Sequence, residues 1–404
     1  MKKIIALALV LVMVLGMFAG CGKKAEKMTL KVWGPNEDQA TAESFLPVAC
    51  AKFNEAHPEW DIEFVFEVCA EGDAGTMVTK DPSAAGDVYM FANDQLGTLL
   101  QANAIARLGG AALDQVKADN SETMVASVTS GDGVYGVPFT GNTWFMYYDA
   151  SVYTADDIKS LDAMMAKKPV AFEVTNAWYL PAFYFAAGGT MFGESGTDGA
   201  AGVTFGGEVG AAATTYIANA LAAGTLVEAG GGAGMDALRN GTVGAVFSGT
   251  WDAANVKDAL GDNYAAAQLP CITLDGKECQ LLSFSGSKAF AVNPNSQHME
   301  AAVALAAWLG SAEMQELHFD LRNGEVIPCA SALLADEKFS ANPAAVAQND
   351  TIANTSFLQP SIPEMGAYWG PGADMGKALV NGDVTADNAA AMADEWNNSL
   401  NGGL

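Results

Sequence analysis

Hydrophobic and polar positions in the first part of the chain follow two different periods. Residues 29–33 alternate as a β-strand does, whereas apolar residues recur at helical spacing over 46–53 until Pro58 breaks the helix. Two further strands are predicted at residues 60–68 and 87–91. Strand, helix and strand in succession are typical of a mostly parallel, layered α/β sheet, in which ligands bind at the loops that follow the strands.

The pattern changes near residue 140. Two apolar strands, 134–138 and 143–148, are separated by Phe139-Thr-Gly-Asn142, where we place a crossing from one lobe to a second. Glycine and alanine dominate residues 188–249, yet 208–221 predicts a helix and 244–247 a strand. The strand-like run 281–292 and the apolar helix 299–309 then indicate a return to the first lobe.

These crossings predict two lobes joined by several strands. We expect an N-terminal lobe of residues 29–139 and 288–338, and a C-terminal lobe of residues 140–287 and 339–404. About 380 residues in two lobes agree with the usual size of about 100–200 residues for one domain.

The N-terminal residues are typical of an export signal. Met1-Lys2-Lys3 precedes an apolar run that is too short to span a bilayer and ends in Ala19-Gly20-Cys21. The pattern predicts a lipoprotein signal peptide over residues 1–20, lipid on Cys21 and a tether over 21–28. An ordinary secretory signal that is cut nearby is the alternative, and it also predicts export.

Charge limits the class of ligand. The formal net charge of −27 argues against nucleic acid and anionic lipid as partners, because both need clustered Lys and Arg. Arginine occurs only at positions 107, 239 and 322. Sites for phosphate or carboxylate groups usually depend on arginine, so a neutral ligand is favoured.

Cysteine and histidine predict neither a metal site nor a cofactor site. His57, His298 and His318 are too scattered for a metal cluster. Five cysteines follow Cys21, and two pairs among them could form disulfides or remain thiols. The first pair, Cys271 and Cys279, flanks an Asp-Gly turn, and the second pair is Cys50 and Cys69.

Six segments carry a resemblance that runs in order over nearly the whole exported chain. They are Thr29–Trp33, Ala85–Phe91, Val134–Pro138, Tyr179–Gly189, Met235–Trp251 and Ser361–Trp369. Together they resemble the extracytoplasmic sugar-binding proteins of ABC importers, and most of all the maltose/maltodextrin-binding proteins.

The resemblance implies a two-lobed fold of the type II periplasmic-binding-protein class with a multi-strand hinge. It implies a monomer that has no enzymatic activity or cofactor, closes on an oligosaccharide and delivers it to a membrane permease. With lipid on Cys21, such a receptor is expected on the outer face of the membrane of a Gram-positive cell.

The resemblance also implies which residues bind the sugar. A glucan has apolar C–H faces and a rim of hydroxyls, so its site needs aromatic rings together with carboxylates and amides. The family stacks sugar rings at positions that match Trp178, Trp251 and Trp369, and further platforms are expected at Tyr179, Phe91 and Trp144. Hydroxyl partners are expected at Asp94, Asn93, Glu37, Asp38 and Asn142.

Several alternatives remain open. Phe91 and Trp144 fit a core as well as they fit a site. Asn142 stands where the maltodextrin relatives usually have glutamate, and Gln95 where they often have arginine, so the sugar's length and linkage are open. A binder of a different oligosaccharide, a surface glycosidase and a lipoprotein that binds polysaccharide without transport are the rival functions.

Overall fold

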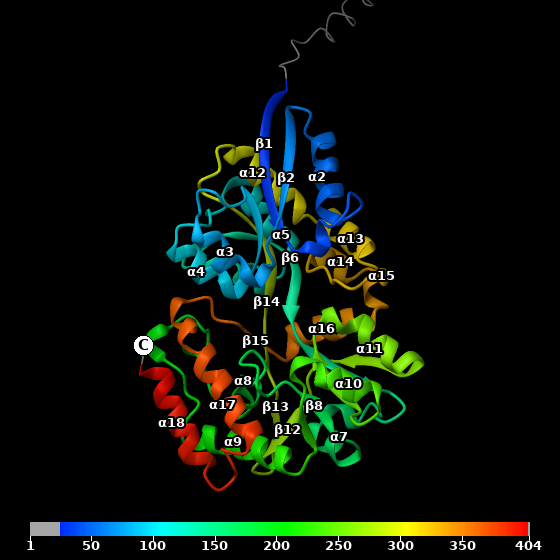
Figure 1. Ribbon diagram of the computed structural model, residues 1–404, viewed down its shortest axis with the longest axis vertical. Coiled ribbons are helices and arrows are strands. Elements are labelled where there is room, and N and C mark those ends of the chain that lie inside the picture. Colours follow the sequence, from blue (N-terminus) through cyan, green and yellow to red (C-terminus); the bar gives the residue numbers. More distant parts are fainter. Residues whose placement is uncertain (1–24, 403–404) are drawn as a thin grey trace, which may run out of the picture.

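Two lobes, one above the other along the long axis, make up the computed structural model of the chain, which describes residues 25–402 (Figure 1). The predicted signal peptide 1–20 and Cys21 lie outside the described residues. The first strand begins at Glu26, so residues 26–28, which were predicted as part of the tether, belong to β1. None of the helices in the described part is long and apolar enough to cross a bilayer.

The upper lobe is built on a six-stranded sheet with the order β15-β14-β3-β1-β2, in which β6 also pairs with β14. Its strands are β1 (Glu26–Gly34), β2 (Trp60–Val68), β3 (Val88–Ala92), β6 (Gly136–Thr143), β14 (Ser283–Val292) and β15 (Ser356–Leu358). β1 is parallel to β2 and to β3, while β14 runs antiparallel to β3. The strands predicted at 29–33, 60–68 and 87–91 are therefore confirmed.

Helices cover this sheet. They are α2 (Phe45–Ala56), α3 (Ala74–Lys80), α4 (Leu96–Gln101), α5 (Gly110–Asp119), α6 (Glu122–Ser127), α12 (Met299–Leu309) and α13 (Ala312–Leu321). The helix predicted at 46–53 is α2, which ends at a cap on His57 and buries Leu46 and Phe53 in the core. The helix predicted at 299–309 is α12.

The strand pair β6 and β14 passes from the upper lobe into the lower one (Figure 1). Residues 139–142, which were predicted to separate two strands, belong to β6; Thr140, Gly141 and Asn142 pair with β14, and the register shifts between Lys288 and Ala289. The backbone N–H and C=O groups of this segment form hydrogen bonds with β14, some 140 residues later in the chain. The segment is therefore a strand although its side chains do not alternate between apolar and polar.

Buried hydroxyls line this hinge. Alternate serines of β14 each bond a hydroxyl from a different segment, at 2.6–2.8 Å: Ser283 with Thr143, Ser285 with Ser356, and Ser287 with Ser127. Small side chains let these segments approach closely, and the hydroxyl pairs satisfy one another without water.

The lower lobe is built on a five-stranded sheet with the order β11-β7-β10-β8-β9. Its strands are β7 (Phe145–Asp149), β8 (Val170–Phe172), β9 (Leu226–Glu228), β10 (Ala245–Ser248) and β11 (Tyr264–Ala267). Its helices are α7 (Leu161–Lys167), α8 (Pro181–Ala186), α9 (Gly207–Ala222), α10 (Ala233–Arg239), α11 (Ala253–Leu260), α16 (Pro343–Asn354), α17 (Trp369–Asn381) and α18 (Ala389–Asn401). The predicted helix 208–221 and strand 244–247 are confirmed as α9 and β10.

Short elements complete the chain. They are the hairpins β4 (Thr129–Ser130) with β5 (Gly133–Val134) and β12 (Cys271–Leu274) with β13 (Lys277–Gln280), and the helices α14 (Ser331–Leu334) and α15 (Glu337–Ser340). Asp275 and Gly276 both have positive φ between β12 and β13, which confirms the predicted Asp-Gly hairpin turn.

Both proposed disulfides are absent, because all five cysteines in the described part of the chain are free. Cys271 is opposite Gln280 in the hairpin, whereas Cys279 is opposite Ile272, so the two thiols project from opposite faces. Cys50 is buried within α2, and the thiol of Cys69 donates to the carbonyl oxygen of Ala70. The structure therefore agrees with the alternative prediction, in which these cysteines remain unpaired thiols.

Candidate functional site

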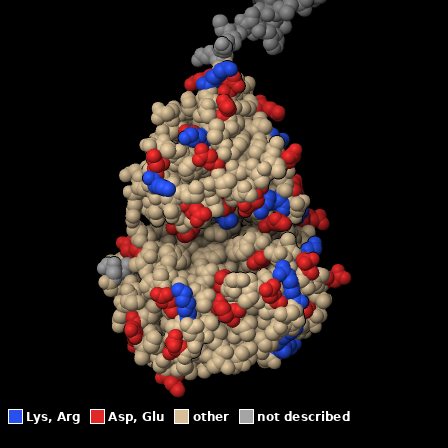
Figure 2. Space-filling view, viewed as in Figure 1, with Lys and Arg blue, Asp and Glu red and all other residues tan. Residues whose placement is uncertain are grey.

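A pocket of about 230 Å³ lies between the lobes, where Figure 2 shows a furrow across the molecule. Its upper wall is formed by the turn η1 (Asn36–Asp38) that follows β1, by the hinge strands β6 and β14, and by the end of α13. Its lower wall is formed by the turn η7 (Thr250–Asp252) that follows β10. Among the predicted site residues, it brings together Glu37, Asp38, Asn142 and Trp251.

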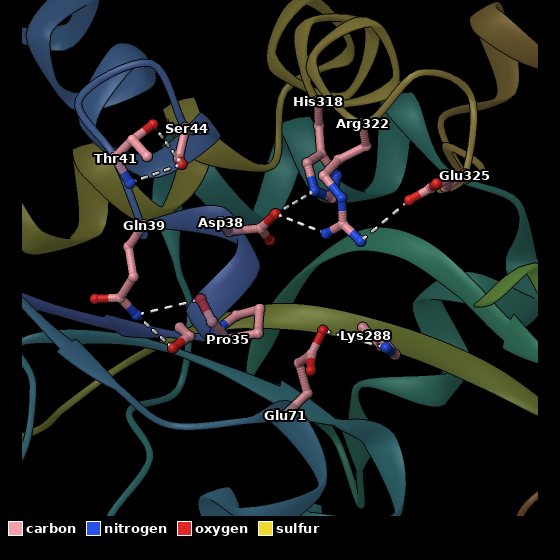
Figure 3. Close-up of polar contacts among 11 residues, drawn as sticks. Pro35, Asp38, Gln39, Thr41, Ser44, Glu71, Lys288, His318, Arg322 and Glu325 are labelled. Atoms are coloured by element: carbon pink, nitrogen blue, oxygen red, sulfur yellow. Dashed lines mark hydrogen bonds and ion pairs between the residues drawn. The ribbon is translucent and has the colours of Figure 1, made fainter.

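Asp38 is held by two basic side chains from the last turn of α13 and the residue that caps it (Figure 3). Its Oδ1 lies 2.9 Å from Nε2 of His318 and accepts a hydrogen bond of 3.0 Å from Nη1 of Arg322. The side chains of Asp38 and His318 are 1% and 3% exposed, whereas that of Arg322 is 22% exposed. Only the arginine of this cluster therefore presents substantial surface to the pocket.

The environment of Asp38 predicts an acid-sensitive contribution to stability. Burial raises the pKa of Asp38, but the charges and hydrogen bonds of His318 and Arg322 outweigh burial and hold that pKa below its usual range. A carboxylate with a lowered pKa in the folded protein stabilises it above the unfolded-state pKa of about 3.9, and this contribution disappears as the pH falls through the folded-state value.

We therefore expect Asp38→Asn to reduce the difference in unfolding free energy between pH 7 and pH 3 by up to about 1.2 kcal/mol, because only the part of the contribution that lies between the unfolded-state pKa of about 3.9 and pH 3 is lost over this range. Urea unfolding of both proteins at the two pH values measures this difference. Asp258→Asn, at an exposed carboxylate of α11, is the matched control and should leave the difference nearly unchanged. Equal pH dependence in Asp38→Asn and the unsubstituted protein would contradict the interpretation.

A second ion pair crosses the pocket wall. Nζ of Lys288, on the hinge strand β14, lies 3.2 Å from Oε1 of Glu71, and both residues line the pocket (Figure 3). Glu37 is exposed, and Glu325 lies 3.8 Å from the guanidinium of Arg322. The upper wall thus presents charged groups and the Asn142 amide, all of which can bind hydroxyls.

The lower wall is aromatic. Trp251 is 48% exposed, and its ring lies over the backbone of Gly249, where a Cβ would approach the ring within 2.1 Å. The ring of Trp178 is 6.0 Å from that of Trp251 and tilted by 37°, and its indole N–H donates to Oε1 of Gln359 at 2.8 Å. The Trp251 ring therefore faces the polar upper wall, whereas Trp178 packs beside it and is not among the residues that line the pocket.

Trp369 stands at the first position of α17 and is partly buried. Its ring packs against Phe284 and Tyr368, at centroid distances of 6.2 and 5.5 Å. It does not line the pocket around Trp251, so its contact with a ligand stays a prediction.

Asn93 and Asp94 also lie outside the lining of this pocket. Asn93 is 1% exposed, and within the described chain neither its amide oxygen nor its amide nitrogen has a hydrogen-bond partner. Burial raises the pKa of Asp94, which accepts a 2.6 Å hydrogen bond from Gln95. Their roles as sugar contacts remain predictions.

Three predicted platforms belong to the cores and not to the cleft, which corrects the prediction for them. Phe91 is fully buried in the upper core. Trp144 is also fully buried and stacks on Tyr179, which is 3% exposed, with ring centroids 4.7 Å apart. Phe91 lies in β3, Trp144 between β6 and β7, and Tyr179 in the turn before α8, and all three rings are buried in a hydrophobic core, so they are not available to a ligand.

Sequence reasoning missed most of the charged wall. Glu71, Lys288, His318, Arg322 and Glu325 line the pocket but were not among the expected site residues. One signal was available, because His318 and Arg322 are four residues apart at the end of one helix and Arg322 is among only three arginines in the chain.

Comparison with known proteins places the chain among binding proteins. The family model for bacterial extracellular solute-binding proteins matches residues 48–347. A protein whose structure was solved with acarbose is 45% identical, with a TM-score of 0.87 over 93% of this chain and 99% of that one.

Two other solved structures share the fold. A maltodextrin-binding protein from L. casei BL23, solved without ligand, is 28% identical, with a TM-score of 0.84 over 93% of this chain and 99% of that one. A cyclo/maltodextrin-binding protein in complex with maltotetraose is 22% identical, with a TM-score of 0.76 over 94% of this chain and 98% of that one. Among curated proteins, no match was found.

Proposed function

Because the chain belongs to the family of bacterial extracellular solute-binding proteins, we propose that it captures maltodextrin-type α-glucan oligosaccharides and delivers them to an ABC importer. The observation that carries the proposal is the pocket in which the exposed face of Trp251 opposes a wall of charged and amide groups. The acarbose and maltodextrin titles of the similar structures support the sugar class.

Binding follows from the two walls. The apolar face of a sugar ring packs on Trp251 and Trp178, while its hydroxyls exchange hydrogen bonds with water for bonds to the upper wall. Since each lobe supplies one wall, a ligand gains all these contacts only when the lobes are closed, and it therefore shifts an open–closed equilibrium about β6 and β14.

Isothermal titration calorimetry of the exported chain tests the sugar class. We expect maltotriose and longer maltodextrins to bind, with a dissociation constant in the micromolar range or below, and a galactoside or xylan fragment of equal length to bind at least about tenfold more weakly. Heat from the control sugar and none from maltotriose would leave the binding function but remove the α-glucan assignment.

A surface glycosidase is the rival from another class. Two of the pocket carboxylates form ion pairs, Asp38 with Arg322 and Glu71 with Lys288. A glycosidase instead needs two carboxyl groups that are available as acid and as base or nucleophile. We expect maltopentaose to be recovered unchanged after prolonged incubation with the protein. Shorter products, measured by mass spectrometry, would favour the enzyme.

Membrane attachment through lipid on Cys21 is part of the proposal, and the apolar leader before it is what supports it. The lipid would hold a monomeric receptor beside its permease in a Gram-positive cell. Cys21→Ala is expected to abolish incorporation of labelled fatty acid while the protein is still exported. Labelling that persists in this variant would contradict the anchor.

A further inference from the structure

We infer that Arg322 is the cation that binds sugar hydroxyls on the upper wall of the pocket, and that Asp38 and His318 are positioning residues that hold it there. The inference rests on the proposed function, because it assigns roles within the sugar site. It differs from the expectation that Asp38 itself meets a sugar hydroxyl.

Asp38 has little to offer a ligand. Its side chain is 1% exposed, and its Oδ1 already interacts with His318 at 2.9 Å and with Arg322 at 3.0 Å. A carboxylate oxygen with two such partners is largely satisfied. Asp38 lines the pocket but exposes almost no surface to it, and its Oδ1 is engaged by His318 and Arg322, so we take it to act on a ligand through these partners.

Arg322 has hydrogen-bond donors that no other residue of the described chain uses. Its guanidinium carries five N–H groups, of which one on Nη1 is used on Asp38, while Nη2 lies 3.8 Å from Glu325, beyond hydrogen-bond distance. The side chain is 22% exposed and lines the pocket that Trp251 also lines. A planar guanidinium presents adjacent N–H groups in a fixed fork, which suits the two oxygens of a vicinal diol on a sugar ring.

His318 keeps this arrangement rigid. Its ring packs on Phe139 and Phe45, at centroid distances of 4.6 and 4.7 Å, and it is 3% exposed. Because His318 and Arg322 are four residues apart, both reach Asp38 from one face of α13 and its C-cap. Without Asp38 the long arginine side chain loses the contact that fixes its direction.

A purely structural ion pair predicts a different result. If Arg322 only neutralises the buried charge of Asp38, its removal lowers the stability of the protein but leaves the affinity of the folded protein unchanged. Binding measured on folded protein therefore separates the two roles, and a double-mutant cycle separates positioning from direct contact.

The cycle uses maltotriose affinity, measured by calorimetry, in Arg322→Met, Asp38→Asn and the double variant. We expect Arg322→Met to weaken binding about tenfold and Asp38→Asn to weaken it by less. The double variant should bind about as weakly as Arg322→Met alone, because Asp38 acts through Arg322. Arg239→Met, at an exposed arginine of α10, is the matched control and should bind like the unsubstituted protein.

Two results would overturn the inference. Unchanged affinity in Arg322→Met removes the arginine from the recognition of the sugar. Losses that multiply in the double variant show that Asp38 contacts the sugar itself. If Asp38→Asn does not fold, Arg322→Lys is tested in its place, because lysine keeps the positive charge but not the planar pair of N–H groups. We expect this variant to bind maltotriose several-fold more weakly. Full affinity would contradict recognition of the sugar by the guanidinium.

A ligand-free measurement keeps the positioning role distinct from the proposed function. The chain has only three arginines, so their guanidinium N–H signals in an NMR spectrum can be assigned by substitution. We expect the Nη1–H signal of Arg322, which donates to Asp38, to be protected from solvent exchange and to lose this protection in Asp38→Asn. Equal protection in both proteins would overturn the positioning role of Asp38. If maltotriose does not bind the unsubstituted protein, the proposed function and the sugar contact of Arg322 are overturned.

Discussion

Replacing Trp251 by alanine is expected to weaken maltotriose binding by about 30-fold, which corresponds to about 2 kcal/mol. Trp251 is 48% exposed, so its ring has apolar area that a ligand can cover. Burial of apolar surface contributes about 25 cal/mol per Å², and stacking on the face of a ring adds to this.

Trp251→Phe is the matched control for this prediction. A phenyl ring keeps a flat face over Gly249, so we expect most of the affinity to return. Because Trp251 is about half exposed, we expect the change in stability of either variant to be smaller than the change in affinity. Calorimetry and thermal unfolding measure the two quantities. If Trp251→Ala binds as the unsubstituted protein does, the aromatic wall is not part of the site.

Gly376→Ala is expected to lower the free energy of unfolding by about 2–4 kcal/mol. Gly376 lies in α17, where a Cβ would come within 2.2 Å of the carbonyl oxygen of Val174, a backbone atom that cannot turn aside. Helix α17 must then move away from the segment that follows β8. The Tyr368 hydroxyl, next to α17, donates to the carbonyl oxygen of Ala177, so this docking also positions Trp178.

Gly370→Ala in the same helix is the matched control. No atom lies within 4 Å of the position that its Cβ would take, and the residue is exposed, so alanine should stabilise the helix by up to about 1 kcal/mol. Urea unfolding of the two variants gives the comparison. Equal stabilities would contradict the close packing of α17 on the backbone of residues 174–175.

Elements whose pattern is local could be predicted from the sequence. β1, α2 and β2 were, because alternation and helical spacing report which side of each element is buried. The strand at 139–142 could not be, since its polar residues form a strand only by pairing with β14, far along the chain. The pattern of side chains along one segment does not show which distant strand its backbone pairs with.

The site divides in the same way. Trp251, Asn142, Glu37 and Asp38 were expected from the resemblance to sugar-binding proteins, and they do line one pocket. Arg322 is 284 residues from Asp38, and nothing local to either residue indicates that they meet.

The burial of individual aromatic side chains also could not be predicted from sequence motifs. Phe91 and Tyr179 match the positions of ligand contacts, but their rings point into the cores. A residue at the end of a strand can face the core or the ligand, and the covering helices decide which.

A crystal structure of the protein with maltotriose tests the central claim, that one oligosaccharide binds between the two lobes, most directly. The account predicts a sugar ring stacked on Trp251, with hydroxyls of the same molecule within hydrogen-bond distance of the upper wall at Arg322 or Asn142. Maltotriose bound to one lobe alone, or outside the pocket that these residues line, would contradict it.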